Sequence, residues 1–134
     1  MSLHGKKILL VDDEKDVLAA LKLALEHWHG SVEAFSNSKD AFDAFANQPD
    51  SFDIVVTDIK MSVMTGFELA AKVRAIRPRI PIIFISGYDV QSAKQELLAG
   101  EIKYEDVFRK PFDMATLRDA ILSKVEKASD AKST

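Results

Sequence analysis

The sequence predicts an α/β fold, a doubly wound parallel sheet of five strands with helices on both faces. Two observations lead to this prediction. Short runs of apolar and β-branched residues alternate along the chain with segments in which apolar residues recur at helical spacing. Several of the short runs are almost free of polar residues, which is typical of parallel strands that are covered on both faces.

The expected strands are five short segments. They are residues 7–11, 32–35, 53–57, 82–85 and 107–109. The residues just before the last of them, 101–106, are polar and show little periodicity.

A helix is expected after each strand, because apolar residues there recur on one stripe between start and stop signals. The expected boundaries are a stop near Gly30 for the first, an N-cap at Ser38 for the second, residues 66–77 for the third, residues 90–99 for the fourth and a start near Asp113 for the fifth. Residues 128–134 are expected to form a polar tail. We therefore expect one domain over residues 1–134, with its core between about residues 6 and 127.

Composition limits the possible functions. The 134 residues include 18 basic and 21 acidic side chains, which give a net charge of −3 and imply no broad basic surface for nucleic acid. The absence of cysteine removes disulfides, thiolate metal sites and cysteine nucleophiles. No apolar run approaches the roughly 18 residues of a membrane span, so we expect no membrane association and a cytoplasmic protein.

Chemically useful side chains follow four of the expected strands. Asp12 and Asp13 follow the first strand, Asp58 the third, Ser86 the fourth and Lys110 the fifth. Each of these residues alone would be an ordinary turn or capping residue. In a sheet of this kind the ligand site lies outside the carboxyl ends of the strands, so these residues are expected to converge at one edge.

Clustered carboxylates favour a bound cation. At about 4 Å and an effective dielectric near 20, each close pair of carboxylates costs roughly 4 kcal/mol. Oxygen ligands select Mg²⁺ or Mn²⁺, which would relieve this repulsion. An aspartate beside such a cation and a lysine can act as a nucleophile toward a phosphoryl group.

Four motifs together, VDDE, TDIKMSVMTG, FISGY and RKPF, resemble the receiver domain of two-component response regulators, of the kind found in chemotaxis regulators. The resemblance covers about residues 6–127. It implies a flavodoxin-like sheet with strand order 2-1-3-4-5. It also implies a phosphorylation-dependent signalling switch, in which a phosphoryl group passes from the phosphohistidine of a sensor histidine kinase or phosphotransfer protein to this chain.

The resemblance implies a role for each motif residue. Asp58 would accept the phosphoryl group, and Asp13 would bind Mg²⁺ directly with Asp58 and the backbone carbonyl of Lys60, while Asp12 would act indirectly. Ser86 would hydrogen-bond a phosphoryl oxygen and Lys110 would pair with the same group. The bond between Lys110 and Pro111 would be cis. Such a domain is not an enzyme in the usual sense, but it assists its own phosphorylation and dephosphorylation.

The sequence departs from the family pattern at the output switch. Val107 stands where the family usually has an aromatic residue that moves on phosphorylation. We expect either that Phe108 or Tyr104 substitutes for it or that Ser86 moves without an aromatic partner. Tyr88 is expected to slow loss of the phosphoryl group. The surface of the fourth helix, fifth strand and fifth helix would carry the output, to a partner or domain that the sequence does not identify, in a monomer or weak dimer.

Two other functions remain open. One is an aspartyl-phosphate phosphatase of the haloacid dehalogenase type, which wants a second aspartate where this chain has Lys60. The other is a pseudo-receiver that only binds partners, which would predict loss of Asp13, Asp58 or Lys110. A further basic cluster, Lys72, Arg74, Arg77 and Arg79, is expected to be a solvated face, with kinase docking as the alternative.

Overall fold

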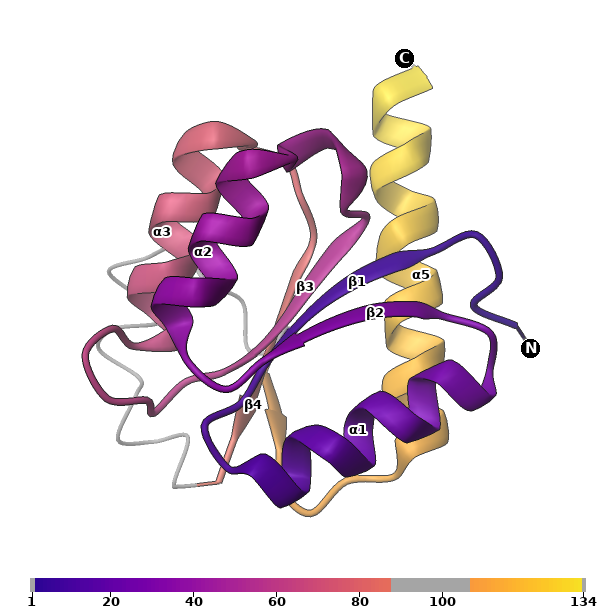
Figure 1. Ribbon diagram of the computed structural model, residues 1–134. Helices are drawn as coiled ribbons and strands as arrows, with labels where there is room; N and C mark the ends of the chain where they lie inside the picture. The colour runs from indigo at the N-terminus through magenta and orange to yellow at the C-terminus, as the bar shows by residue number, and fades with distance from the viewer. Residues whose placement is uncertain (1, 88–106, 134) are drawn as a thin grey trace.

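The computed structural model describes residues 2–87 and 107–133. Its five parallel strands form one sheet in the order β2-β1-β3-β4-β5, which confirms the expected fold and strand order (Figure 1). The strands are β1 (Lys7–Val11), β2 (Ser31–Phe35), β3 (Ile54–Asp58), β4 (Ile82–Ser86) and β5 (Val107–Arg109). Every residue of β3 and β4 is buried, because helices cover both faces of the centre of the sheet.

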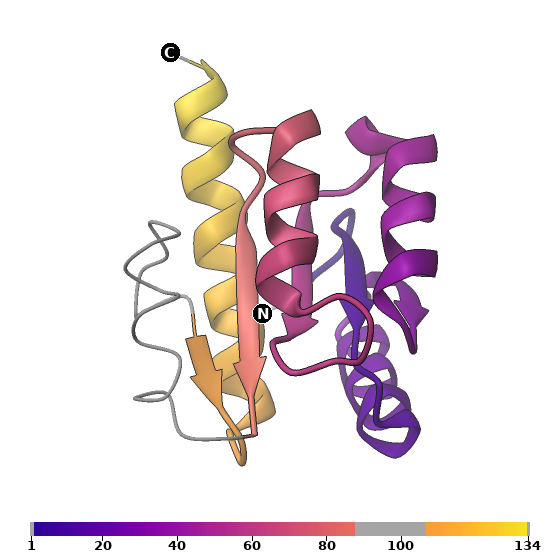
Figure 2. The same cartoon turned by 90° about the vertical axis from the view of Figure 1, so that its left-hand side faces the viewer.

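Helices cover both faces of the sheet, α2 and α3 on one side and α1 and α5 on the other (Figures 1 and 2). Their bounds are α1 (Lys15–His27), α2 (Ser38–Asn47), α3 (Gly66–Ile76) and α5 (Met114–Ser133), and the short 3₁₀-helix η1 (Pro49–Ser51) follows α2. The fourth helix expected at residues 90–99 lies outside the described residues. In the part of the chain that is described, no helix is both long and apolar enough to span a membrane.

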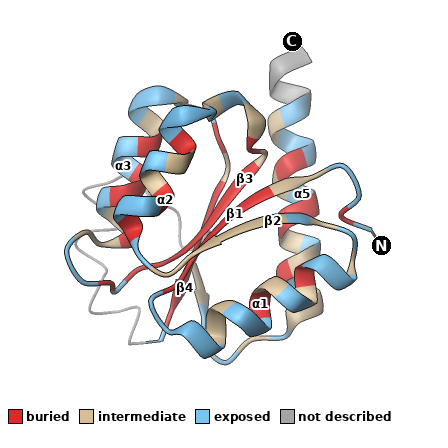
Figure 3. Cartoon of the chain, in the orientation of Figure 1, coloured by how far each residue is buried: buried red, intermediate tan, exposed pale blue. Residues whose placement is uncertain are grey.

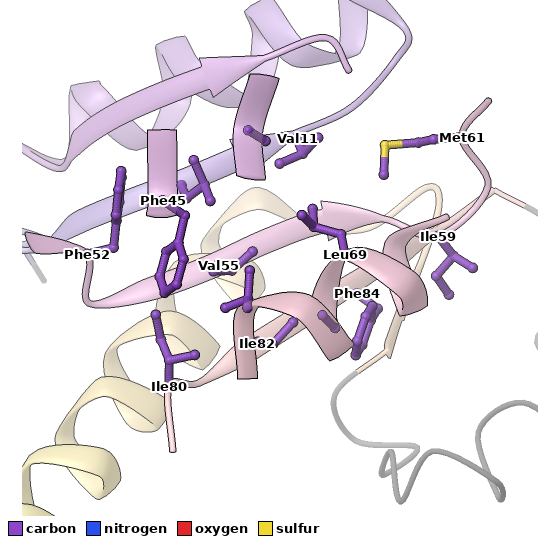
Figure 4. Close-up of a cluster of buried hydrophobic side chains, with 14 residues drawn as sticks. Val11, Phe45, Phe52, Val55, Ile59, Met61, Leu69, Ile80, Ile82 and Phe84 are labelled. Atoms are coloured by element: carbon purple, nitrogen blue, oxygen red, sulfur yellow. The ribbon is translucent and has the colours of Figure 1, made fainter. Parts of the chain in front are cut away.

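Alternation along the strands divides the core into two layers. In β1, Leu9 and Val11 pack toward α2 and α3, whereas Ile8 and Leu10 pack toward α1 and α5. Figure 3 shows the buried strands between helices whose outer faces are exposed. Figure 4 shows the first layer, in which Phe45 of α2 and Leu69 of α3 meet Val11 and other residues of the sheet.

Several expected boundaries differ from the structure. Bounds of β2, β3, β4 and α3 shift by one residue, and two further differences concern α2 and α5. The N-cap of α2 is Asn37, whose Oδ1 accepts the backbone N–H of Asp40 at 2.8 Å, and Ser38 is the first, buried residue of the helix. Asparagine and serine both cap helices well, so the sequence alone does not distinguish Asn37 from Ser38, and the expected N-cap was wrong by one residue. Residues 128–133 continue α5 instead of forming a separate polar tail.

Trp28 contacts both the N-terminal segment and α5. Leu3 is fully buried, and its backbone N–H donates to the carbonyl of Trp28 at 2.7 Å. The Arg118 guanidinium of α5 lies 4.7 Å from the centre of the Trp28 ring, within range of a cation–π contact. The single tryptophan therefore sits where the N-terminal segment, α1 and α5 meet.

Candidate functional site

The carboxyl ends of the strands bring the expected polar side chains together. The Lys110 Nζ atom lies 3.1 Å from Asp12 Oδ2 and 3.8 Å from Asp58 Oδ2, although these residues are far apart in sequence. An open pocket of about 390 Å³ lies beside them. It is lined by Asp13, Glu14, Asp58, Lys60, Gly87 and Lys110.

Asp12 is the fixed centre of this site. Its carboxylate is fully buried, and burying a charge is costly unless it is paired. One carboxylate oxygen accepts the backbone N–H of Glu14 at 2.9 Å, and the other accepts from Lys110 Nζ at 3.1 Å. Asp12 thereby positions Lys110 instead of lying open to the pocket.

Asp58 ends β3 and reaches the pocket with little solvent around it. Asp58 is only 5% exposed, and its Oδ1 atom accepts a hydrogen bond from the backbone N–H of Ile59 at 2.9 Å. Burial raises the pKa of this carboxyl to about 6, and the negative charge of Asp12 adds to the effect against the lowering influence of Lys110. With this pKa, the Asp58 carboxyl is ionised in most molecules at neutral pH. Its Oδ2 atom lies on the side of Lys110.

Lys110 carries the positive charge of the site. Burial alone would lower the pKa of its ammonium group, but the hydrogen bond from Lys110 to Asp12 and the charges of Asp12, Asp58 and Glu14 outweigh burial and raise it. The ammonium group of Lys110 therefore stays charged at neutral pH.

Three carboxylates could hold a divalent cation. Those of Asp12, Glu14 and Asp58 offer oxygen atoms that all lie within 4.8 Å of one another. An all-oxygen set of this size suits a hard cation such as Mg²⁺. The donor set present in the structure therefore fits the metal that the sequence implies.

Glu14 is the residue that sequence reasoning missed. It ends the VDDE motif, in which only the two aspartates are expected to act at the site. It occupies the N-cap of α1 with extended backbone angles and makes no side-chain capping bond. Its Oε1 lies 3.6 Å from Lys110 Nζ. Asp13 is exposed and lines the pocket, but it is not one of the three clustered carboxylates. The unbroken run of three acids was the only available signal.

Ser86 and Lys110 are joined through the ends of β4 and β5. Ser86 is fully buried as the last residue of β4, and its carbonyl accepts the backbone N–H of Lys110 at 2.7 Å. The bond from Lys110 to Pro111 is cis, as expected. The hydroxyl-bearing residue and the lysine thus belong to one backbone-linked edge.

The loop between β3 and α3 packs tightly against Asp58. A Cβ on Gly66 would overlap the carbonyl oxygen of Asp58, so the close backbone approach requires glycine here. Thr65 caps α3 in a reciprocal arrangement with Glu68, which fixes where the helix starts. Val63, 97% exposed with a φ of 72°, adopts a left-handed conformation that β-branched residues rarely take.

Val107, at the usual switch position, and Phe108, one of its expected substitutes, face opposite sides of the sheet. Val107 packs against the core layer of α2 and α3, whereas Phe108 packs in the layer of α1 and α5, with its ring centre 6.0 Å from that of Phe112. Phe108 would have to act from the other face if it replaces the usual aromatic residue. Tyr88 and Tyr104 lie outside the described residues.

Comparison with known proteins gives a consistent result. The profile of the family described as response regulator receiver domain matches residues 8–122. The response regulator protein TodT of Pseudomonas putida is 31% identical over 99% of this chain, which spans only 57% of TodT. The response regulator receiver protein CpdR of Brucella abortus is 34% identical over 91% of this chain and 95% of its own length. A response regulator receiver domain protein from Clostridium thermocellum superimposes with a TM-score of 0.82 at 28% identity, covering 92% of this chain and 97% of that one.

Proposed function

The chain belongs to the family of response regulator receiver domains, and we propose that it is a signalling switch controlled by phosphorylation of Asp58. The observation that carries this proposal is the position of the Asp58 carboxylate. It is ionisable near neutral pH, it lies 3.8 Å from Lys110, and it lines the same pocket as the carboxylates of Asp13 and Glu14.

We infer a different task for each oxygen of Asp58. Oδ1 is held by the Ile59 N–H, which leaves Oδ2, on the Lys110 side, as the nucleophile. Oδ2 would form a bond to phosphorus as the bond from phosphorus to the donor's imidazole nitrogen breaks, and the imidazole would leave with its electron pair and take up a proton. Lys110 would then pair with a phosphoryl oxygen, and Ser86 would donate a hydrogen bond to another.

A divalent cation, when bound, would offset charge on the phosphoryl oxygens. We propose Mg²⁺ or Mn²⁺, with Asp13, Asp58 and the backbone carbonyl of Lys60 as direct ligands and Asp12 as an indirect one. Glu14 is the alternative to Asp13 as a direct metal ligand, because its carboxylate clusters with those of Asp12 and Asp58. Measuring Mg²⁺ affinity by titration in Asp12→Ala, Asp13→Ala and Glu14→Ala decides between them. The largest loss in Asp13→Ala supports the proposed ligand set, and the largest loss in Glu14→Ala replaces Asp13 by Glu14.

Intact-mass measurement tests the phosphoacceptor directly. The protein is incubated with acetyl phosphate and Mg²⁺, and we expect a gain of one phosphoryl group in the parent and none in Asp58→Ala. Asp43→Ala is the matched control, because Asp43 is an exposed aspartate on α2. Steady turnover of a phosphoester substrate would instead indicate a phosphatase. No mass gain in the parent would indicate a module that only binds partners.

Signal input and output extend the proposal beyond the site. The phosphodonor would be a sensor histidine kinase or a phosphotransfer protein in the cytoplasm. The output would leave through the surface of the fourth helix, β5 and α5, by a partner or by further domains in a longer protein. Comparing the structural response to a phosphoryl analogue in Val107→Ala and Phe108→Ala tests the switch. An unchanged response in both would remove these two residues from the output path.

A further inference from the structure

A groove lined by cations lies at the end of the sheet opposite the phosphorylation site. Its volume is about 240 Å³, and we call it the basic groove. It is lined by Arg74, Arg79, Pro81, Ile82, Lys124, Lys127 and Ala128. The C-terminal ends of α3 and α5 flank the start of β4 here (Figure 2). At about 3.3 Å per strand residue, the length of β4 puts Ile82 some 13 Å from Ser86.

Positive charge is concentrated here against the overall charge of the protein. The basic groove and a neighbouring pocket share Pro81 and Ala128. Together they are lined by six of the 18 basic residues of the chain, Lys6, Arg74, Arg77, Arg79, Lys124 and Lys127, and by one acid, Asp53. The chain as a whole carries a net charge of −3, so the groove is a local exception to its charge.

Internal structure accounts for only some of these cations. The Arg77 guanidinium donates to the carbonyls of Pro49 and Phe52, which makes it a strut between α3 and the chain around η1. By contrast, Arg79 and Lys127 are exposed and make no hydrogen bond or ion pair with any side chain or backbone group of residues 2–87 and 107–129. Within the described part of the chain, the Nε–H of Arg74 is buried without an acceptor, and its Nη2 makes a long contact of 3.4 Å with the Ile80 carbonyl.

The helix dipole accounts for the position of Arg74 but not for those of Arg79 and Lys127. Cations stabilise the last turn of a helix, and Arg74 lies in the last turn of α3. Arg79, however, lies beyond the end of α3. Lys127 lies more than one turn before the end of α5 at Ser133. These two cations therefore have no evident structural role.

The chemistry of the groove selects its occupant. Arginine forks bind carboxylates in a bidentate manner, and the three apolar lining residues, Pro81, Ile82 and Ala128, suit a short apolar side chain beside the acid. The volume of about 240 Å³ suits a few side chains. A nucleic-acid duplex would need a longer basic stripe on a less acidic protein.

We propose that the basic groove is a docking site for an acidic segment of a partner protein, one that carries glutamate or aspartate next to a small apolar residue. Because the groove lies at the amino ends of the strands, docking there leaves the pocket around Asp58 open. The partner would stay bound whether or not Asp58 is phosphorylated.

Titration followed by NMR tests this proposal with a defined probe. The probe is a short synthetic peptide rich in glutamate with an interspersed alanine, added to the isotope-labelled protein. We expect the amide signals of Ile82, Lys127 and Ala128 to shift, and the affinity to fall with rising salt. In the double variant Arg79→Glu, Lys127→Glu the affinity should fall by about tenfold or more.

The matched control is Lys72→Glu, which makes the same kind of charge change on α3. Lys72 lies over the Phe42 ring on the α2 side and is not part of the groove, so peptide affinity should stay near that of the parent. Phosphoryl uptake from acetyl phosphate should be unchanged in all variants, which separates this test from that of Asp58. If the double variant does not fold, the single variants Arg79→Ala and Lys127→Ala replace it.

Three outcomes would overturn the proposal. The first is binding that persists unchanged in the groove variants. The second is equal binding of a peptide with glutamine in place of glutamate. The third is a stronger response to inorganic phosphate or to a short DNA duplex than to the acidic peptide, which would indicate a site for phosphate groups.

Discussion

The two ends of the sheet carry opposite charge and hold it in different ways. At the carboxyl ends, Asp12 and Asp58 are buried and pinned by backbone N–H groups and by Lys110. At the amino ends, Arg79 and Lys127 stand exposed. A buried charge affects folding as well as chemistry, whereas an exposed charge costs little to place or remove. Changes of the buried charges at the first end should therefore alter stability, and changes of the exposed Arg79 and Lys127 at the second should alter binding alone.

Gly66→Ala should have the largest effect on the carboxyl end. The new Cβ would overlap the Asp58 carbonyl, and backbone must move to relieve the overlap, so we expect a loss of about 3 kcal/mol or more in the free energy of unfolding. Urea denaturation measures it. The control is Gly87→Ala, where the nearest atom to an added Cβ is Lys110 Cδ at 3.8 Å, an ordinary contact. Equal stabilities of the two variants would show that the loop yields easily.

Asp58→Asn should stabilise the metal-free protein in a pH-dependent way. The carboxyl has a pKa of about 6 in the folded state, against an ordinary value of 3.8. Between these two pH values the folded state binds more protons than the unfolded state, so stability falls as pH rises. Removing the ionisable group should raise stability by up to about 3 kcal/mol above pH 7, with no gain below pH 4. Denaturation at a series of pH values checks this. A gain that does not change with pH would mean that relief of packing, not of charge, is responsible.

Lys110→Met should destabilise the protein by about 2 kcal/mol at neutral pH, because it leaves Asp12 and Asp58 without the cation between them. The matched change at the other end, Lys127→Met, should alter stability by less than about 0.5 kcal/mol. Thermal unfolding of both variants makes the comparison. Similar losses of stability in the two variants would mean that a buried charge and an exposed charge contribute equally to the stability of this fold.

The smallest expected effect separates two arginines at the amino end. Arg77→Ala removes the donor to two backbone carbonyls and should cost about 1.5 kcal/mol, whereas Arg79→Ala should cost less than about 0.5 kcal/mol. Chemical denaturation resolves the difference. A marked loss in Arg79→Ala would give Arg79 a structural role and weaken the case for the basic groove.

The sequence predicted the sheet and the convergence of Asp12, Asp58 and Lys110 because parallel strands leave no choice about where their carboxyl ends meet. It did not predict which acids cluster. The direction of a side chain within the run from Asp12 to Glu14 depends on local backbone angles at the start of α1, and composition carries no trace of these.

The other errors have similar causes. Asn37 and Ser38 are equally good caps, and only the backbone decides between them. A polar segment such as residues 128–133 can extend an existing helix without an apolar stripe, because helix elongation is easier than nucleation. The basic groove is lined by residues of both α3 and α5. The spacing of residues within one helix does not predict which other helix lies beside it.

The position of Trp28 provides an optical readout. As the only tryptophan, it reports from the junction of the N-terminal segment, α1 and α5, where Arg118 lies against its ring. At 1.5 Å per residue, the 13 residues of α1 set it roughly 20 Å from the pocket that begins at Asp13. Its fluorescence should follow loss of the fold but hardly respond to Mg²⁺ or phosphoryl groups. Unfolding of each variant can therefore be recorded without an added label, with or without a ligand at the site.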